Sequence, residues 1–267
     1  MQLYSYTNMK HNFRHIVLPI AIISIFFIVG CNGCGENTSP AVVGLNTQIT
    51  WGGENIAIGD TVIDFAGRQV RPEKLICYIS NISLRQVDGN WISSESLDRL
   101  DFMPNSDFVD GVFPFEMIEE TYVFDSIRFS VGVPEELNTD VVPSNYPNDH
   151  PLGVVGSADM HWPMMSTYFT MKLEGKVADI SGEEIITPFA MHPATNPLYR
   201  TLSFELPETM ALYPNEIRNY QFNLDLEKTI NGNAGIINLN EIGHSMGNVE
   251  NTVRFVDNLS TAWTLIE

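Results

Sequence analysis

Apolar and polar residues alternate along several short segments of the chain, which is the pattern of β-strands with one buried face. The clearest segments are 76–84, 127–133, 169–173, 202–206 and 220–226. Segments with a sustained helical period are lacking, and only the tail 249–266 is ambiguous, since it could contain one short helix. Many short strands joined by turn-forming residues predict an all-β fold, an antiparallel β-sandwich that forms a single domain over residues 44–267.

The alternation also predicts which side chains form the core, because residues two positions apart point to the same face of a strand. One expected face consists of Ile76, Tyr78, Ile82 and Leu84, and another of Phe169, Met171 and Leu173. Four large side chains on these strands are predicted to be buried, namely Ile76, Phe129, Phe169 and Phe222.

The N-terminal 30 residues have the pattern of an export signal. Residues 16–30 are apolar and uncharged, and the basic residues Lys10 and Arg14 precede them. A run of this length is too short to cross a bilayer as a helix, which takes about 20 residues. We therefore expect this segment to be removed and exclude it from the fold.

The apolar run ends in Ile28, Val29, Gly30 and Cys31, which resembles the lipobox of bacterial lipoprotein signals. We expect cleavage before Cys31, lipid on its sulfur, and a membrane-anchored location in the bacterial cell envelope. Residues 1–30 are then the signal peptide, and residues 31–43 are a flexible tether of small and polar residues. An ordinary signal peptide, or a membrane anchor with a chance cysteine, is the alternative interpretation, and Met9 is an alternative start.

The net charge argues against a nucleic-acid partner, and the cysteine content argues against a disulfide-rich fold. Residues 1–30 contain two basic and no acidic residues, so their removal changes the formal net charge from −19 to −21. Nucleic-acid phosphates would repel such a protein, and the acidity instead favours solubility. Three cysteines are too few for a disulfide framework. A bridge between Cys34 and Cys77 is one alternative, and a buried, free Cys77 in an apolar strand is the favoured one.

Common catalytic signatures are missing from the chain. It contains no G-x-S-x-G, H-E-x-x-H, P-loop or G-x-G-x-x-G motif. Paired carboxylates such as Glu135 and Glu136 lie in polar, loop-like contexts, where a solvated surface explains them. We therefore expect that the protein is not an enzyme.

One segment is unusually rich in soft metal donors. Residues 159–165 contain an imidazole, an indole and three thioethers, contributed by His161, Trp162 and three methionines that include Met164. A second imidazole, His192, ends the probable strand that follows Glu184. Thioether and imidazole are ligands that suit Cu(I), because soft donors match a soft cation. The alternative is that these residues are core side chains and ordinary loop histidines.

Several blocks in this order resemble the MbnP-like family, whose members are associated with methanobactin and copper handling. The blocks are Y-I-S-N-I-S-L at 78–84, F-D-S-I-R-F-S-V-G-V at 124–133, D-M-H-W at 159–162, Y-F-T-M-K-L-E-G at 168–175 and F-A-M-H at 189–192. Together they span about half of the chain that would remain after cleavage.

The resemblance implies a secreted or lipid-anchored β-sandwich protein of the bacterial envelope. Some members of the family bind copper through histidines and a tryptophan oxidised to kynurenine, a change attributed to a partner dihaem enzyme related to cytochrome c peroxidases. By position, Trp162 matches the modified tryptophan and His192 matches the histidine of the last block. Met164 replaces a second tryptophan or a histidine, and Thr167 replaces a glycine. We therefore expect a copper site formed by His192 with Trp162, Met164 or His161, unless the metal has been lost.

A second hypothesis assigns the same sandwich to a surface protein that binds glycan or another ligand without metal. Its binding platform would consist of exposed aromatic rings, for which the candidates are Trp91, Trp162, Tyr168 and Tyr199. Geometry separates the two hypotheses, since a metal site needs converging donor atoms and a platform needs coplanar exposed rings.

Overall fold

The computed structural model describes residues 40–104, 106, 108–116, 122–179, 182, 184–247 and 249–266. The expected signal peptide, the lipidated Cys31 and Cys34 lie outside these residues. Within them, no helix has the length and hydrophobicity of a membrane span.

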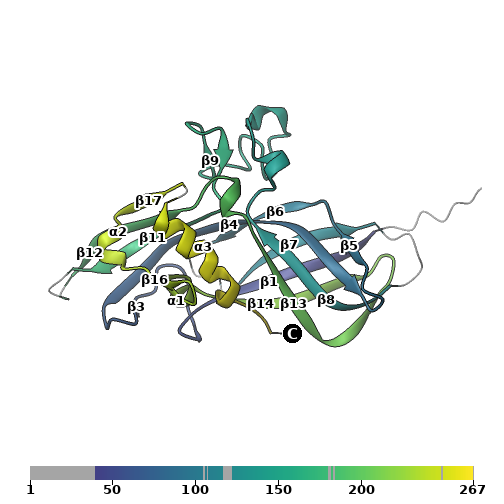
Figure 1. Ribbon diagram of the computed structural model, residues 1–267, viewed down its shortest axis with the longest axis horizontal. Coiled ribbons are helices and arrows are strands. Elements are labelled where there is room, and N and C mark those ends of the chain that lie inside the picture. Colours follow the sequence, from purple (N-terminus) through teal and green to yellow (C-terminus); the bar gives the residue numbers. More distant parts are fainter. Residues whose placement is uncertain are drawn as a thin grey trace, which may run out of the picture. The chain divides into compact units, whose positions relative to one another are not determined.

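The first of two mixed sheets has the strand order β18-β14-β1-β2, with β7 also paired to β1 (Figure 1). Its strands are β1 (Ala41–Trp51), β2 (Glu54–Asn55), β7 (Phe108–Phe115), β14 (Ile217–Asp225) and β18 (Trp263–Leu265). Strand β1 therefore already begins inside the segment that was expected to be the tether.

The second sheet has the order β13-β8-β4-β11-β12-β17, and three short strands also pair with β4 (Figure 1). The main strands are β4 (Gln69–Gln86), β8 (Tyr122–Val131), β11 (Met171–Ala178), β12 (Ile185–His192), β13 (Arg200–Leu212) and β17 (His244–Met246). The short ones are β3 (Val62–Ile63), β5 (Trp91–Ser93) and β6 (Leu97–Phe102).

Smaller elements complete the described chain. Two hairpins stand apart from the sheets, β9 (His161–Trp162) with β10 (Thr167–Tyr168) and β15 (Asn231–Gly232) with β16 (Gly235–Ile236). The helices are α1 (Leu226–Ile230), α2 (Leu239–Ile242) and α3 (Glu250–Ala262), with 3-10 turns at Glu135–Leu137, Pro143–Asn145 and Asn196–Leu198. Helix α3 lies in the tail 249–266, for which the sequence allowed one short helix. It contacts strands of both sheets.

The predicted all-β sandwich is confirmed, and most strand pairs are antiparallel as expected. Two pairs differ, because β1 runs parallel to β14 and β12 runs parallel to β17. The partners in each of these pairs are far apart in the sequence, so the intervening chain is long enough for the crossover that parallel strands require. The strictly antiparallel arrangement predicted from the sequence is therefore wrong for these two pairs.

The main core lies between the two sheets and is rich in aromatic rings. The Phe129 ring lies 5.2 Å from that of Phe222 and 5.1 Å from that of Trp263, in edge-to-face geometry with both. Cys77 lies in the same core as a free thiol, as the sequence favoured, and burial raises its pKa. A buried neutral thiol of this kind packs as a small apolar side chain.

A β-bulge in β4 changes which residues face this core. At Asn81 the backbone has φ 50°, and the pairing of β4 with β8 shifts register. Because the bulge inserts an extra residue, the alternation changes phase across it. Ile82 and Leu84 therefore face the main core, whereas Ile76 and Tyr78 face the opposite side of the sheet. The single face predicted from these four residues is wrong.

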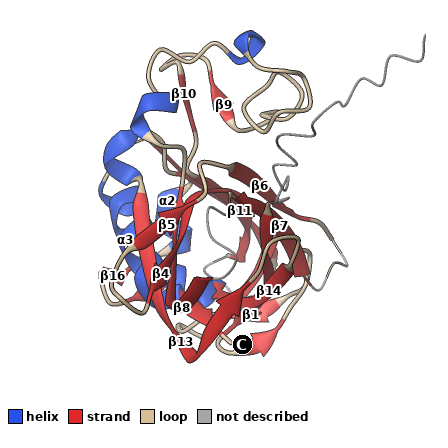
Figure 2. Ribbon diagram, turned by 90° about the vertical axis from the view of Figure 1, so that its right-hand side faces the viewer, coloured by secondary structure: helices blue, strands red, loops and turns tan. Residues whose placement is uncertain are grey.

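The opposite side of the second sheet carries a second apolar cluster. It consists of Ile76, Tyr78, Val133, Val141, Leu152, Met160, Tyr168, Phe169 and Ala194. Phe169 belongs here while Met171 and Leu173 face the main core, because the chain between β10 and β11 makes only an isolated bridge at Phe169. The shared face predicted for these three residues is therefore also wrong. Figure 2 shows the segment that contains β9 and β10 at this side of the sheets.

The four burial predictions are confirmed. Ile76, Phe129, Phe169 and Phe222 are at most 4 % exposed. They belong to two separate clusters, Phe129 and Phe222 to the main core and the other two to the second.

We predict that Phe129→Ala lowers the free energy of unfolding by about 3–5 kcal/mol, because it removes a fully buried ring and leaves a cavity among its aromatic neighbours. Urea denaturation measures this change. Val87→Ala, at a side chain that is 58 % exposed, is the matched control and should change stability by less than about 0.5 kcal/mol. Equal effects of the two substitutions would contradict this assignment of the core.

Candidate metal centre

Three neighbouring strands present a row of polar and soft side chains on the outer face of the second sheet. Phe189 and Met191 of β12 face the main core, so Ala190 and His192 face outward. The strand register places Ala190 beside Glu174 of β11 on one side, and His192 beside Met246 of β17 on the other. His244 pairs with Ala190, two residues before Met246 on the same face of β17.

His192 forms hydrogen bonds through both ring nitrogens. Its Nε2 lies 2.8 Å from Oε1 of Glu174, and its Nδ1 lies 2.9 Å from Nε2 of His244. A carboxylate can only accept, so in the neutral ring Nε2 of His192 carries the hydrogen and Nδ1 carries the lone pair. The His244 Nε2–H then donates to that lone pair. Glu174 thus fixes which nitrogen of His192 faces His244.

Burial keeps the His192 imidazole neutral. Its side chain is 8 % exposed. Desolvation lowers the pKa of this imidazole to about 4, and the nearby charge of Lys172 acts in the same direction. The carboxylate of Glu174 raises the pKa but does not outweigh these two effects. A metal ligand must be deprotonated, so the group is ready to bind at neutral pH.

Aromatic rings pack beside His192, whereas His244 at the sheet edge is exposed. The Phe169 ring lies 5.3 Å from that of His192, and Trp162 stacks on Phe169 at 5.5 Å with planes 15° apart. Trp162 also covers the end of β17, since a Cβ placed on Gly247 would lie 3.2 Å from Cη2 of the indole. The N–H of Gly247 in turn donates to the His192 carbonyl at 3.0 Å. Trp162 and His192 therefore contact the same ring, that of Phe169.

The other two candidate ligands lie differently. Met164 is 88 % exposed, so its thioether points to solvent. His161 alternates with Trp162 on β9, and its ring lies 5.6 Å from that of Tyr168 instead of on the Phe169 side. It also lines a hollow with Ser157 and Asp159 that does not include His192.

Sequence reasoning missed the three residues that surround His192. Glu174 lies within the block at 168–175, but nothing in that block marks it as a partner of His192. His244 and Met246 lie outside every block, and the one signal for them is their spacing of two residues, which places both on the same face of a strand.

The histidine pair fits a metal ion with a small movement. At metal–nitrogen distances of about 2.0–2.1 Å, two ligand nitrogens in tetrahedral geometry lie roughly 3.3 Å apart. The facing nitrogens of His192 and His244 are 2.9 Å apart, so a movement of a few tenths of an ångström would bring them to a ligating distance. The hydrogen of the His244 ring must also be on Nδ1 instead of Nε2, because a ligating nitrogen needs its lone pair. Among the residues that the structure describes, no three His, Cys, Asp or Glu side chains are grouped to hold a metal. Two nitrogens alone therefore form the core of this site.

The aromatic side chains proposed as a ligand platform do not act together. Tyr168 is fully buried, and Trp162 is stacked on Phe169. Trp91 lies on another part of the sheet, where the guanidinium of Arg128 sits 4.0 Å from its ring centroid. The geometry therefore favours the histidine pair over the platform.

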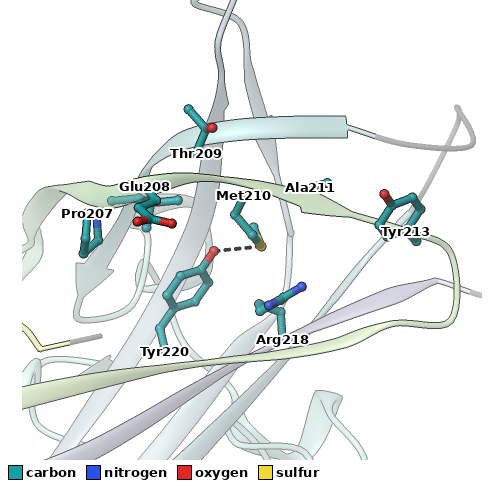
Figure 3. A pocket seen from close by; sticks show the side chains of 9 residues that line it. Pro207, Glu208, Thr209, Met210, Ala211, Tyr213, Arg218 and Tyr220 are labelled. Carbon is teal, nitrogen blue, oxygen red and sulfur yellow. Dashed lines mark hydrogen bonds between the residues drawn. The ribbon is translucent and has the colours of Figure 1, made fainter.

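A cavity of about 670 Å³ lies away from the histidines, where β13 and β14 diverge (Figure 3). Its lining is mostly apolar, and the Tyr220 hydroxyl donates to the sulfur of Met210 at 3.2 Å across it. Arg218 and Glu208 provide charges of both signs. No histidine or cysteine lines this cavity, so it offers neither of the strong metal ligands found at the histidine pair.

Comparisons with known proteins identify the family of this chain. The solved structure of MbnP from Methylosinus trichosporium matches with a TM-score of 0.49 and 12 % sequence identity, over 78 % of this chain and 81 % of that one. No curated protein matches the chain. The MbnP family matches residues 40–246, which include every motif block and both histidines of the pair. The resemblance read from the sequence is thereby confirmed, and the chain belongs to the MbnP family.

Proposed function

We propose that this protein is a non-catalytic copper-binding protein of the bacterial envelope, with His192 and His244 as its nitrogen ligands. The observation that carries the proposal is the pair of facing ring nitrogens 2.9 Å apart, one of them on His192, which packs against Phe169. Imidazole is a ligand that suits copper in both of its common oxidation states. The copper association of the MbnP family supports the choice of metal.

Glu174 orients the His192 ring without itself binding the metal. Histidine ligands commonly donate their second ring N–H to a carboxylate, which fixes the ring and raises its basicity as a ligand. The hydrogen bond from His192 to Glu174 has this form. Lys172 lies with its ammonium 4.8 Å over the Phe169 ring and offsets the charge of Glu174 near the pair.

Trp162 has two roles in this proposal. Its half-buried ring limits the access of water to His192, since it packs between Phe169 and the end of β17. Its oxidation to kynurenine by a dihaem partner related to cytochrome c peroxidases stays a prediction from the family resemblance. The partly exposed position of the ring is compatible with an external oxidising partner.

We predict that His192→Ala and His244→Ala each lower copper affinity by at least tenfold. Loss of a residue that only hydrogen-bonds to a ligand already costs about 10–100-fold in metal affinity, and each of these substitutions removes a ligand itself. Competition against a chromophoric copper chelator measures the affinity. His161→Ala is the control and should leave it unchanged, because His161 faces Tyr168. Copper affinity that depends on His161 but not on His244 would overturn the assignment.

The depressed pKa of His192 predicts how the metal-free protein responds to acid. Between about pH 6.5 and 4 the unfolded chain binds a proton at this residue and the folded chain does not, so the contribution of neutral His192 to stability is lost as pH falls through this range. We expect the difference in unfolding free energy between wild type and His192→Gln to shrink over that window. Parallel urea curves at pH 7 and pH 4.5 measure it, and a difference that grows on acidification contradicts the assignment.

The envelope location rests on Cys31. We predict that Cys31→Ala abolishes lipidation and releases the protein from the membrane fraction, because the thiol is the acceptor of the lipid. Fractionation with intact mass measurement tests this, and Cys34→Ala serves as the matched control that should stay membrane-bound. A Cys31→Ala protein that still carries lipid, or a wild type that retains residues 1–30, would show that the anchor is assigned wrongly.

A further inference from the structure

The histidine pair leaves a bound copper ion short of ligands. Two nitrogens are available, while Glu174 is engaged with the far nitrogen of His192. In the described part of the chain no further His, Cys, Asp or Glu completes a group of three. A third donor among the described residues is therefore of another type.

Met246 occupies the position where such a donor is needed. It is the direct partner of His192 in the parallel pairing of β12 with β17, and paired residues project from the same face of a sheet. It lies two residues after His244 on that face, so the three side chains are adjacent. Its side chain is half-buried and packs against the second apolar cluster together with Trp162.

The local geometry holds Met246 in this place. The Gly247 N–H donates to the His192 carbonyl, which fixes the end of β17 immediately after Met246. Gly247 has φ 70° and lies against the Trp162 ring, so a side chain there would meet the indole. These contacts fix the backbone on the C-terminal side of Met246, next to its pairing with His192.

The chemistry of this set selects among metal ions. Two imidazoles and a thioether match Cu(I), a soft cation that accepts sulfur ligands. Zn²⁺ sites normally have four ligands drawn from imidazole, thiolate and carboxylate. The burial of His192 beside the Phe169 ring also disfavours the ion of higher charge, because desolvation costs more for a divalent cation than for a monovalent one.

We infer that the thioether of Met246 is the third ligand of the site and makes it selective for Cu(I) over Cu(II) and Zn(II). This inference rests on the proposed function, since it takes His192 and His244 as the nitrogen ligands. The sulfur donor is then Met246 on β17, while Met164, the methionine next to the tryptophan motif, remains in solvent.

Met246→Leu tests the inference, because leucine keeps the apolar volume and removes the sulfur. Met164→Leu is the matched control at an exposed methionine. The affinities of both variants and wild type are measured for Cu(I) under anaerobic conditions, and for Cu(II) and Zn(II). X-ray absorption of the Cu(I)-loaded proteins reports a sulfur neighbour at about 2.3 Å, the usual metal–sulfur distance in proteins.

We expect Met246→Leu to bind Cu(I) at least tenfold more weakly, because even the loss of a residue that only hydrogen-bonds to a ligand costs about tenfold or more. Its affinities for Cu(II) and Zn(II) should change little. The sulfur neighbour should disappear in Met246→Leu and persist in Met164→Leu. Wild-type Cu(I) binding with no sulfur neighbour, or with full affinity in Met246→Leu, overturns the role of Met246 while leaving the histidine pair intact. Wild-type protein that binds no copper overturns this inference and the proposed function together.

Discussion

The site depends on one contact, the parallel pairing of the three-residue strand β17 with the end of β12. Backbone hydrogen bonds hold it at both ends, from the Ala190 N–H to the Gly243 carbonyl at 2.8 Å and from the Gly247 N–H to the His192 carbonyl at 3.0 Å. Without this pairing His244 and Met246 would have no fixed relation to His192. Because β17 forms the edge of the sheet, the same pairing leaves one side of the site open to solvent and to a molecule that delivers the metal.

The strands could be predicted from the sequence because each is a local pattern. Period-two alternation predicted β8 and β14 with their buried residues, and turn residues marked their ends. The pairing of β1 with β14 could not be predicted in this way, since the register of two distant segments leaves no local signal. The bulge at Asn81 also escaped, because one inserted residue reverses the faces of β4 without changing the apolar character of its residues.

In the candidate site, too, residues in local motifs could be predicted from the sequence, and residues placed by long-range contacts could not. Trp162 and His192 could be found because the family resemblance covers the segments that contain them. Met164 was one of the expected ligands because it occupies the motif position of a family tryptophan or histidine, yet its side chain is exposed. Met246 instead packs against the second apolar cluster, as Trp162 does. His244 belongs to no motif, so only the tertiary pairing of β17 identifies it. Donor atoms in such a site converge through long-range contacts, which proximity in sequence cannot predict.

The central claim is that Nδ1 of His192 and Nε2 of His244 bind one copper ion while Glu174 keeps the far nitrogen of His192 protonated. Nitrogen-15 NMR of histidine-labelled protein tests this directly, because Cu(I) is diamagnetic and each ring nitrogen has its own resonance. On addition of one equivalent of Cu(I), we expect those two nitrogens to shift together, while Nε2 of His192 retains its proton. Shifts confined to the His161 or His150 rings, with both nitrogens of the pair unchanged, would contradict the account.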